Sequence, residues 1–252
     1  MVTTPVFHLA PLPVADLFTL AGPEGRHAAA VRRLRVGERL DVTDGGGGAL
    51  RCEVAAVRRD ELDCRVLDRG ASLESSPRLV VVQALAKNDR GELAVEMLTE
   101  AGVDEVVPWA ATRSVVRWEG ERGARARARW AATAAEAAKQ SRRTRWPVVA
   151  DLAGTRAVRD RLATAGLALV LHESATQPLA ALVRDQGTPG WPPAGEIVLV
   201  VGPEGGISDE ELALFTAAGA RAVRLGPTVL RTSTAGVVAA AVLLAATGRW
   251  DG

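Results

Sequence analysis

The sequence predicts a small β domain over residues 1–74, followed by a larger α/β domain over residues 78–252. Two patterns support this prediction. In the first range, short segments in which apolar and polar residues alternate lie between turn signals, as in a small barrel or sandwich. In the second range, apolar strand-like runs alternate with helix-like segments, which is typical of a mostly parallel sheet covered by helices on both faces.

The first domain contains three segments with the two-residue period of a half-buried strand. The run Asp44-Gly-Gly-Gly-Gly48 predicts a turn between the first two, because glycine adopts backbone conformations that other residues avoid. Serine and proline in residues 73–77 predict an extended linker before the second domain. The three strand segments are residues 39–43, 50–54 and 62–67.

The second domain begins with residues 79–85, a continuous apolar run of the kind expected for a strand covered on both faces. Strand-like and helix-like segments then alternate along the rest of the chain. Strands are expected over 105–109, 148–150, 167–171, 196–201 and 222–225, and helices over 90–101, 123–139, 155–165, 209–218 and from about 234.

Capping signals support two of these helices. Asp89 with Glu92, and Ser208 with Glu211, have the three-residue spacing of a capping box, in which each side chain satisfies a free backbone N–H at the helix start. Gly102 predicts the end of the first helix, because a left-handed residue commonly terminates helices.

The composition excludes several classes of protein. Hydrophobic residues make up 48% of the chain and charged residues 24%, so it is not disordered by composition. Cys52 and Cys64 are its two cysteines, and neither has a second ligand at metal-binding spacing, which favours a reducing compartment and no metal site. Residues 1–8 do not resemble a signal peptide, and the most apolar stretch, 235–246, is too short to span a bilayer. We therefore expect a cytoplasmic protein without a membrane partner.

The net charge of +1 conceals a strongly basic segment. Residues 113–145 contain ten basic and three acidic residues. A local positive field of this kind can hold phosphate even when the whole protein is near neutral. The alternative interpretation is a solvated, arginine-rich helix face.

Three strand-like segments of the second domain end in loops suited to a ligand. The run Gly202-Pro-Glu-Gly-Gly206 follows one buried strand, and residues 225–232 form a second glycine-bearing loop. His172 and Glu173 follow a third strand. Open parallel sheets bind ligands at the carboxyl ends of their strands, where glycine lets the backbone approach closely. Taken alone, the run 202–206 is equally consistent with a tight turn into a helix.

At these residues the sequence resembles the 16S ribosomal RNA uridine-N3 methyltransferases, which belong to the trefoil-knotted (SPOUT) class. Gly202-Pro-Glu-Gly-Gly206 and Leu225-Gly-Pro-Thr-Val-Leu-Arg-Thr232 are similar to the two signature loops of that family. The resemblance covers nearly the whole chain, because further motifs follow in the expected order. They are Arg26-His27, Val31-Arg-Arg-Leu-Arg35, Gln83-Ala-Leu-Ala-Lys87, Thr99-Glu-Ala-Gly-Val103 and Gln140-Ser-Arg-Arg143.

The resemblance implies a PUA-like N-terminal β-barrel and a knotted C-terminal domain that binds S-adenosylmethionine (SAM) and forms a homodimer. The implied activity is methylation of uracil N3 in 16S ribosomal RNA, free or in the small ribosomal subunit. No metal is required, because the sulfonium of SAM already carries an activated methyl group. The implied cofactor cleft is lined by Leu171, His172, Glu173, Val201, Gly202, Pro203, Glu204, Gly205, Gly206, Leu225, Gly226, Pro227, Val229, Leu230, Arg231 and Thr232.

Methyl transfer to uracil N3 also requires a proton to leave that nitrogen. Arg231 is the candidate catalytic residue, since a cation stabilises the developing uracil anion, with a competing role in holding RNA phosphate. His172 and Glu204 are candidates for the general base. The candidate RNA-binding residues are Arg26, Arg32, Arg33, Arg35, Arg142 and Arg143.

Two positions depart from the family pattern. Ser233 stands where the family usually has glutamate, and Lys139 replaces the glutamate of a Glu-Gln pair. Two other functions therefore stay open. A knotted ribose 2′-O-methyltransferase is disfavoured, because those relatives carry an asparagine-rich signature and Asn88 is the only asparagine here. A non-catalytic RNA-binding or ribosome-assembly protein is disfavoured by the intact glycine loops, although Ser233 mildly favours it.

Overall fold

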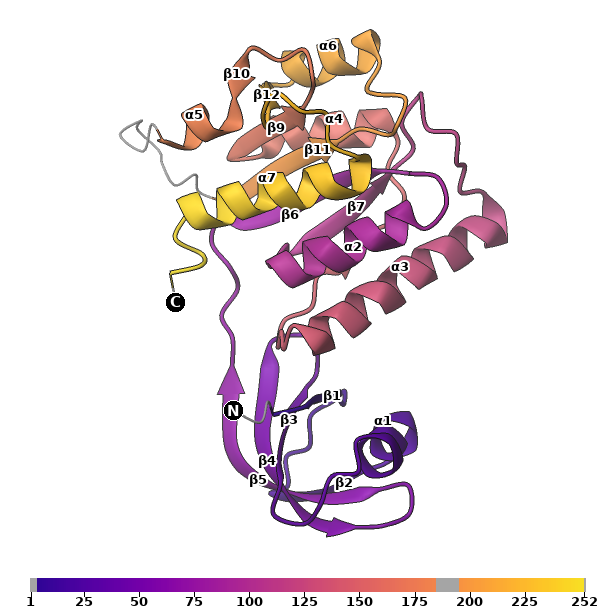
Figure 1. Ribbon diagram of the computed structural model, residues 1–252, viewed down its shortest axis with the longest axis vertical. Coiled ribbons are helices and arrows are strands. Elements are labelled where there is room, and N and C mark those ends of the chain that lie inside the picture. The colour runs from indigo at the N-terminus through magenta and orange to yellow at the C-terminus, as the bar shows by residue number, and fades with distance from the viewer. Residues whose placement is uncertain (1–3, 185–194, 252) are drawn as a thin grey trace. The chain divides into compact units, whose positions relative to one another are not determined.

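The computed structural model describes residues 4–184 and 195–251 (Figure 1). Contacts divide the chain into two compact units, 1–74 with 138–146, and 75–137 with 147–252. The expected domains, 1–74 and 78–252, stay a prediction. The two divisions differ at residues 138–146, which the sequence pattern assigns to the second domain and the contacts assign to the first unit.

The first unit is built on a five-stranded sheet with the order β1-β3-β4-β5-β2. Only β1 and β3 run parallel. Within the described residues, β1 and β2 are the two edges, so backbone hydrogen bonds do not close the sheet into a barrel. The strands are β1 (Val6–His8), β2 (Leu17–Leu20), β3 (Arg39–Thr43), β4 (Gly48–Val57) and β5 (Leu62–Ala71).

The three strands predicted in this unit are present, and β1 and β2 were not predicted because they are too short to show a period. The short helix α1 (Gly22–Arg26) and the π-helix η1 (His27–Val31) were also missed. Alternate strand residues fill the core. Cys52 and Cys64 belong to it, and burial raises the pKa of the two thiols to about 12 and about 11, which keeps them protonated and unreactive.

Residues 138–146 join the first unit through the glycine-rich turn after β3. The backbone N–H of Gly47 and the hydroxyl of Thr43 both donate hydrogen bonds to the Thr144 carbonyl, at 3.1 and 2.8 Å. The N–H of Trp146 donates to the Gly45 carbonyl at 2.9 Å. These long-range hydrogen bonds explain why residues 138–146 belong to the first unit, although their position in the sequence suggested the second domain.

The second unit contains a seven-stranded, all-parallel sheet with the order β10-β12-β9-β11-β6-β7-β8. Its strands are β6 (Arg78–Ala84), β7 (Glu105–Trp109), β8 (Val148–Val149), β9 (Leu167–Leu171), β10 (Gln177–Pro178), β11 (Glu196–Val201) and β12 (Arg221–Arg224). Its helices are α2 (Arg90–Ala101), α3 (Gly120–Gln140), α4 (Thr155–Thr164), α5 (Leu179–Arg184), α6 (Asp209–Ala217) and α7 (Thr232–Ala246). The predicted α/β class is confirmed; β10 and α5 were not predicted.

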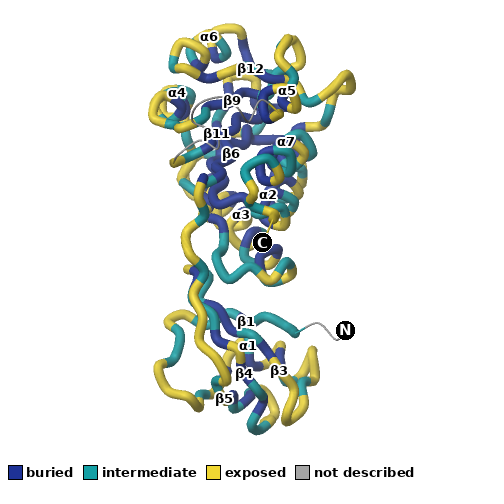
Figure 2. The backbone as a smooth tube through the Cα atoms, turned by 90° about the vertical axis from the view of Figure 1, so that its left-hand side faces the viewer, coloured by how far each residue is buried: buried dark blue, intermediate teal, exposed yellow. Residues whose placement is uncertain are grey.

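The central strands are buried on both faces, as the continuous apolar run in β6 predicted (Figure 2). Leu79 and Val81 pack in one core with residues of α2, α3, α5 and α7. Val80 and Val82 point the other way, into a second core with residues of α4 and α6. Because side chains alternate along a strand, each face of the sheet needs its own layer of helices.

One predicted capping box is present and the other is wrong. At the start of α6, the Ser208 hydroxyl accepts from the Glu211 N–H while the Glu211 carboxylate accepts from the Ser208 N–H. Asp89 makes no cap bond, because its backbone is already near-helical (φ −84°, ψ 3°) and its side chain does not reach the first turn. Glu92 instead pairs with Arg129 of α3 at 3.4 Å.

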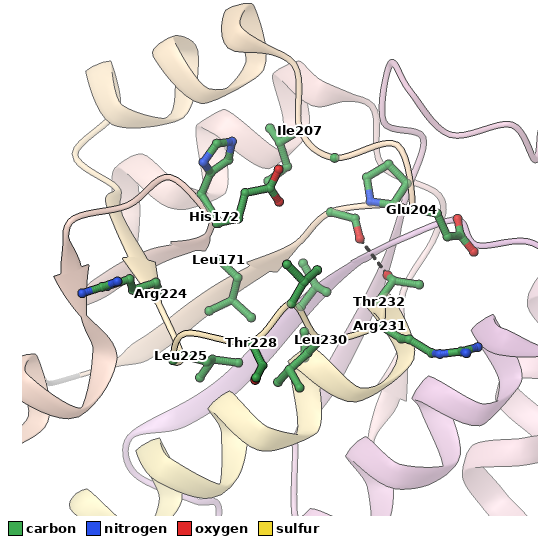
Figure 3. Close-up of a pocket in the computed structure, with 18 of the residues that line it drawn as sticks. Leu171, His172, Glu204, Ile207, Arg224, Leu225, Thr228, Leu230, Arg231 and Thr232 are labelled. Atoms are coloured by element: carbon green, nitrogen blue, oxygen red, sulfur yellow. Dashed lines mark hydrogen bonds between the residues drawn. The ribbon is translucent and has the colours of Figure 1, made fainter.

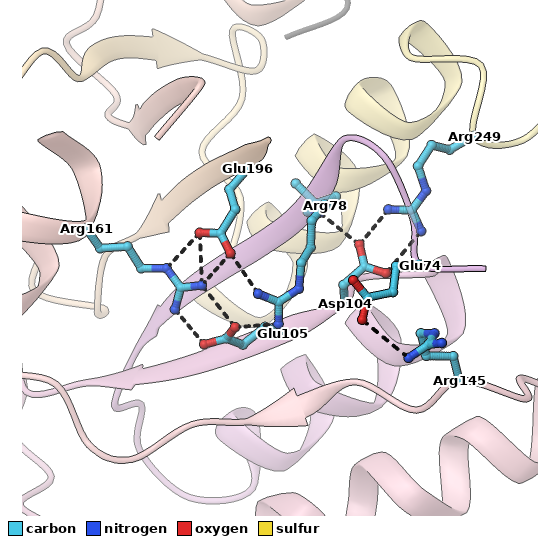
Figure 4. Close-up of polar contacts among 9 residues, drawn as sticks. Glu74, Arg78, Asp104, Glu105, Arg145, Arg161, Glu196 and Arg249 are labelled. Atoms are coloured by element: carbon cyan, nitrogen blue, oxygen red, sulfur yellow. Dashed lines mark hydrogen bonds and ion pairs between the residues drawn. The ribbon is translucent and has the colours of Figure 1, made fainter. Parts of the chain in front are cut away.

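Four charged side chains form a network at the amino ends of the central strands, opposite the strand ends that carry the predicted loops (Figure 4). The Arg78 guanidinium lies 2.7 Å from Glu105 and 2.7 Å from Glu196. The Arg161 guanidinium, from α4, contacts the same two carboxylates at 2.5 and 3.0 Å. The network therefore joins three strands and a helix.

No helix within residues 4–184 and 195–251 has both the length and the hydropathy to cross a membrane. The trefoil knot stays a prediction.

Candidate active site

A cleft of about 680 Å³ lies at the carboxyl ends of three adjacent parallel strands, β12, β9 and β11 (Figure 3). Its volume falls within the range of small-molecule sites. The loops that follow these strands were the three loops singled out in the sequence. They converge because neighbouring parallel strands end at the same edge of a sheet.

A partly buried hydrogen bond joins the two glycine loops, and a buried one from β6 supports it. The Thr232 hydroxyl, at the start of α7, donates to the Gly202 carbonyl at 2.7 Å (Figure 3). The same hydroxyl accepts from the side-chain amide of Gln83 at 2.9 Å, and Gln83 at the end of β6 is fully buried. The backbone of Gly206 is left-handed (φ +75°), a conformation that disfavours other residues there. These contacts preorganise the wall formed by residues 202–206.

Three apolar side chains lie together in the cleft: Leu171 at the end of β9, and Leu225 and Leu230 from the loop between β12 and α7 (Figure 3). All three side chains are half-buried, so part of their apolar surface is accessible to a ligand. Such a wall suits a flat, weakly polar group such as a purine ring.

The polar candidates have distinct positions. His172 Nδ1 accepts a hydrogen bond from the Ser174 backbone N–H at 3.3 Å and contacts the Ser174 hydroxyl at 2.8 Å. The Glu204 carboxylate accepts from the Lys87 backbone N–H at 3.1 Å. Arg231 is exposed on the rim and its side chain points away from the interior of the cleft (Figure 3).

Every residue predicted for the cofactor cleft lines this cavity. Sequence reasoning missed Arg90, at the start of α2, and Ile207, Val223, Arg224 and Ala235 beside the predicted motifs, while Thr228 lies within the predicted loop 225–232. Arg90 belongs to no recognisable motif, although its place after a buried parallel strand was a usable signal. Ser233, where the family pattern has glutamate, is buried at 2% exposure and lies outside this lining.

The candidate RNA-binding residues all belong to the first unit. Arg142 and the four N-terminal arginines are exposed, and Arg143 is partly exposed. Arg142 has a left-handed backbone (φ +58°) just beyond the end of α3. Of the other basic residues in 113–145, those from Arg113 to Arg129 belong to the second unit, and Lys139 and Arg145 belong to the first. No cluster of three or more metal-binding side chains occurs in residues 4–184 and 195–251.

Two family models match the chain. One is described as an RNA methyltransferase domain and matches residues 74–244, and the other as an RNA methyltransferase PUA domain and matches residues 20–67. The ribosomal RNA small subunit methyltransferase E of Mycobacterium bovis is 45% identical over 98% of this chain and 93% of the relative.

Solved structures resemble the chain over nearly its whole length. The ribosomal RNA small subunit methyltransferase E of Neisseria gonorrhoeae, bound to S-adenosyl methionine, has a TM-score of 0.81 and 29% identity over 98% of each chain. A Legionella pneumophila protein in complex with the cofactor SAM has a TM-score of 0.82 and 28% identity, covering 97% of this chain and 98% of that one.

Proposed function

Because the chain belongs to the RNA methyltransferase family of the ribosomal RNA small subunit methyltransferases E, we propose that it transfers a methyl group from SAM to uracil N3 in 16S ribosomal RNA. The observation that supports this most strongly is the cleft. It gathers the three predicted loops at one sheet edge in a chain that matches such a relative almost end to end. The proposed substrate is part of the ribosome, so the proposed site of action is the cytoplasm.

The residues of the cleft fit SAM. The wall of Leu171, Leu225 and Leu230 suits the adenine ring. Glu173 and Glu204 are exposed carboxylates on the lining, and such groups accept hydrogen bonds from ribose hydroxyls or from the ammonium of the methionyl tail. When bound, SAM supplies a methyl group activated by its sulfonium. The protein's own task is to position donor and acceptor for in-line transfer.

The position of each polar group limits its role. His172 Nδ1 accepts a hydrogen bond from the Ser174 backbone N–H. The neutral ring therefore carries its proton on Nε2, and this N–H can only donate a hydrogen bond. This tautomer disfavours His172 as the general base and leaves Glu204 as the candidate. Arg231 on the rim is suited to hold an RNA group at the mouth of the cleft, and it reaches the uracil ring only if its side chain turns inward.

Mass spectrometry of ribosomal RNA nucleosides tests the proposed activity. Deletion of the gene should remove N3-methyluridine from 16S RNA, and the purified protein with SAM should restore it. Loss of a 2′-O-methylnucleoside instead would identify a ribose methyltransferase. An unchanged nucleoside profile, together with an absence of SAM binding in calorimetry of the folded protein, would favour a non-catalytic RNA-binding or ribosome-assembly role.

We propose that six arginines of the first unit bind the RNA backbone, namely Arg26, Arg32, Arg33, Arg35, Arg142 and Arg143. Changing both Arg142 and Arg143 to alanine should weaken RNA binding and make it less dependent on salt. The slope of log affinity against log salt concentration should flatten by about 0.7 for each lost contact with a phosphate of single-stranded RNA. Affinity for SAM should not change. Arg58 and Arg59, also adjacent and exposed in the first unit, provide the matched control. Unaltered RNA affinity and salt dependence in the Arg142/Arg143 double variant would show that these arginines are only a solvated surface.

We also propose a homodimer that uses the outer face of α7. One face of this helix is buried, whereas Val238 on another face is 37% exposed. An apolar helix face without cover favours an interface. Light scattering at micromolar concentration should give twice the chain mass, and Val238→Asp should give a monomer, with Val115→Asp as an exposed control. A monomeric wild-type protein would refute the proposal.

A further inference from the structure

A single buried carboxylate joins three segments beside the cleft. Glu211 Oε1 accepts hydrogen bonds from the Thr112 backbone N–H and hydroxyl, both at 2.9 Å, and from the Thr155 hydroxyl at 3.0 Å. Its Oε2 accepts from the Ser208 N–H at 3.2 Å. The loop after β7, the start of α4 and the start of α6 are therefore joined at one side chain, which is only 3% exposed.

The Glu211 carboxylate is ionised although it forms no ion pair within the described part of the chain. Burial raises its pKa, but the hydrogen bonds from Thr112, Ser208 and Thr155 outweigh burial and lower the pKa below its ordinary value. A helix cap alone needs only the Ser208 contacts. The further donors from Thr112 indicate that this carboxylate also holds the loop after β7 in place.

The hydrogen bonds between Glu211 and Thr112 position the next residue in the chain, Arg113. Its guanidinium Nη1 lies 3.4 Å from the Gly205 carbonyl and 3.4 Å from the Ile207 carbonyl, and both of these residues line the cleft. A Cβ added at Gly205 would lie 3.2 Å from the Arg113 backbone carbonyl and 3.2 Å from its Cβ. The loop after β7 therefore packs directly on the glycine loop and brings a cation against two residues of the cleft wall, although Arg113 itself is not among the residues that line the cleft.

The positive charge of Arg113 is available to a ligand. The side chain is exposed and forms no ion pair among the residues that the structure describes. Its two hydrogen bonds use one nitrogen and are long, so most of the five guanidinium N–H groups face solvent. Nearby Glu210 is fully exposed; its own backbone N–H, then Ser208 and the charge of Arg113, lower its pKa. Solvent screens this acid, so it does not cancel the cation.

We propose that Arg113 binds a backbone phosphate of the RNA next to the methylated nucleotide, and that Glu211 is the positioning residue that holds it there through Thr112. The proposal rests on the proposed function. A fork of exposed N–H donors beside the cleft wall matches phosphate geometry, and a fixed phosphate contact sets the register of the target nucleotide relative to the cleft.

The first test compares Arg113→Ala with the wild-type protein on labelled 16S RNA transcribed in vitro. RNA affinity should fall several-fold, and the salt slope should flatten by about 0.7, the value for one phosphate of a single strand. SAM affinity and Tm should be unchanged. Arg113→Lys should restore the slope but only part of the affinity, because lysine keeps the charge but not the fork. Arg221→Ala, an exposed arginine at the amino end of β12 and so at the end of that strand away from the cleft, is the matched control and should change neither quantity.

A double-mutant cycle tests the positioning role of Glu211. Glu211→Gln keeps the shape but replaces an acceptor oxygen with a donor that faces the Thr112 and Thr155 donors. It should lower Tm and also weaken RNA binding. Combined with Arg113→Ala it should cause no further loss of RNA affinity, because both changes remove the same interaction with phosphate. Additive losses would overturn the positioning role.

Other outcomes separate this inference from the proposed function. If wild-type protein methylates 16S RNA and Arg113→Ala binds that RNA with wild-type affinity and salt slope, the phosphate contact is refuted and the function stands. If Arg113→Ala loses SAM affinity while keeping RNA affinity, the cation belongs to the cofactor site and the inference is wrong. If the wild-type protein neither binds nor methylates the RNA, the proposed function itself fails.

Discussion

Gly205→Val should reduce the affinity for SAM at least about tenfold, because a branched side chain crowds the contact between the glycine loop and the segment packed on it. An added Cβ at Gly205 meets the Arg113 backbone at 3.2 Å, and backbone gives way less easily than the end of a flexible side chain. The structure thus changes the physical reason expected from the sequence. The Cβ would not fill the ligand's own space but would push the loop 202–206 away from its support and toward the cleft. Calorimetry with SAM measures the effect.

Gly154→Ala is the control for this prediction, since its added Cβ has no neighbour within 4 Å and Gly154 lies outside the cleft lining. Its SAM affinity should equal that of the wild-type protein. A normal SAM affinity in Gly205→Val, with the protein folded, would remove this loop from the cofactor site.

Arg161→Ala should lower the free energy of unfolding by about 3 kcal/mol, since it leaves a buried carboxylate partly uncompensated. The Glu105 side chain is 9% exposed and would keep only the ion pair with Arg78. For a protein of this size the loss corresponds to a fall in Tm of about 6–12 °C. Differential scanning calorimetry would measure it. Arg159→Ala, on the same helix, removes an exposed pair with Asp160 and should shift the unfolding free energy by less than about 1 kcal/mol.

The same network predicts a dependence on pH. Burial alone raises the pKa of Glu105, but the hydrogen bonds and charges of Arg161 and Arg78 outweigh it and lower the pKa below the ordinary value of 4.5. A lowered pKa in the folded state means that this stabilisation is present above pH 4.5 and is lost as the pH falls toward the folded value. The Tm difference between wild type and Arg161→Ala should therefore be largest near neutral pH and narrow on acidification. A difference that stays constant down to about pH 3, well below the ordinary carboxyl pKa, would contradict the assignment.

The local features of the fold were predictable from sequence because they depend on neighbouring residues. Four such features depend only on residues a few positions apart in the chain. They are the two-residue period of residues 39–43, the apolar run of β6, the helix cap at Ser208 and the helix end at Gly102. The cap expected at Asp89 failed because the backbone turned helical one residue early. The same sequence signals located the cleft, since loops that follow parallel strands must meet at one edge of the sheet.

By itself, then, the sequence determined the α/β class, the positions of most strands along the chain and most of the residues that line the cleft. Only the tertiary structure decided which distant segments support that cleft. Arg113 reaches Gly205 across 92 residues of sequence, and the Glu211 carboxylate reaches Thr112 across 99. Likewise, residues 138–146 join the first unit through Thr144, which bonds to Thr43 across 101 residues. Hydrophobic periodicity describes which face of an element is buried, but not which partner buries it. Contacts between segments about a hundred residues apart depend on how the layers pack, and no local pattern records that packing.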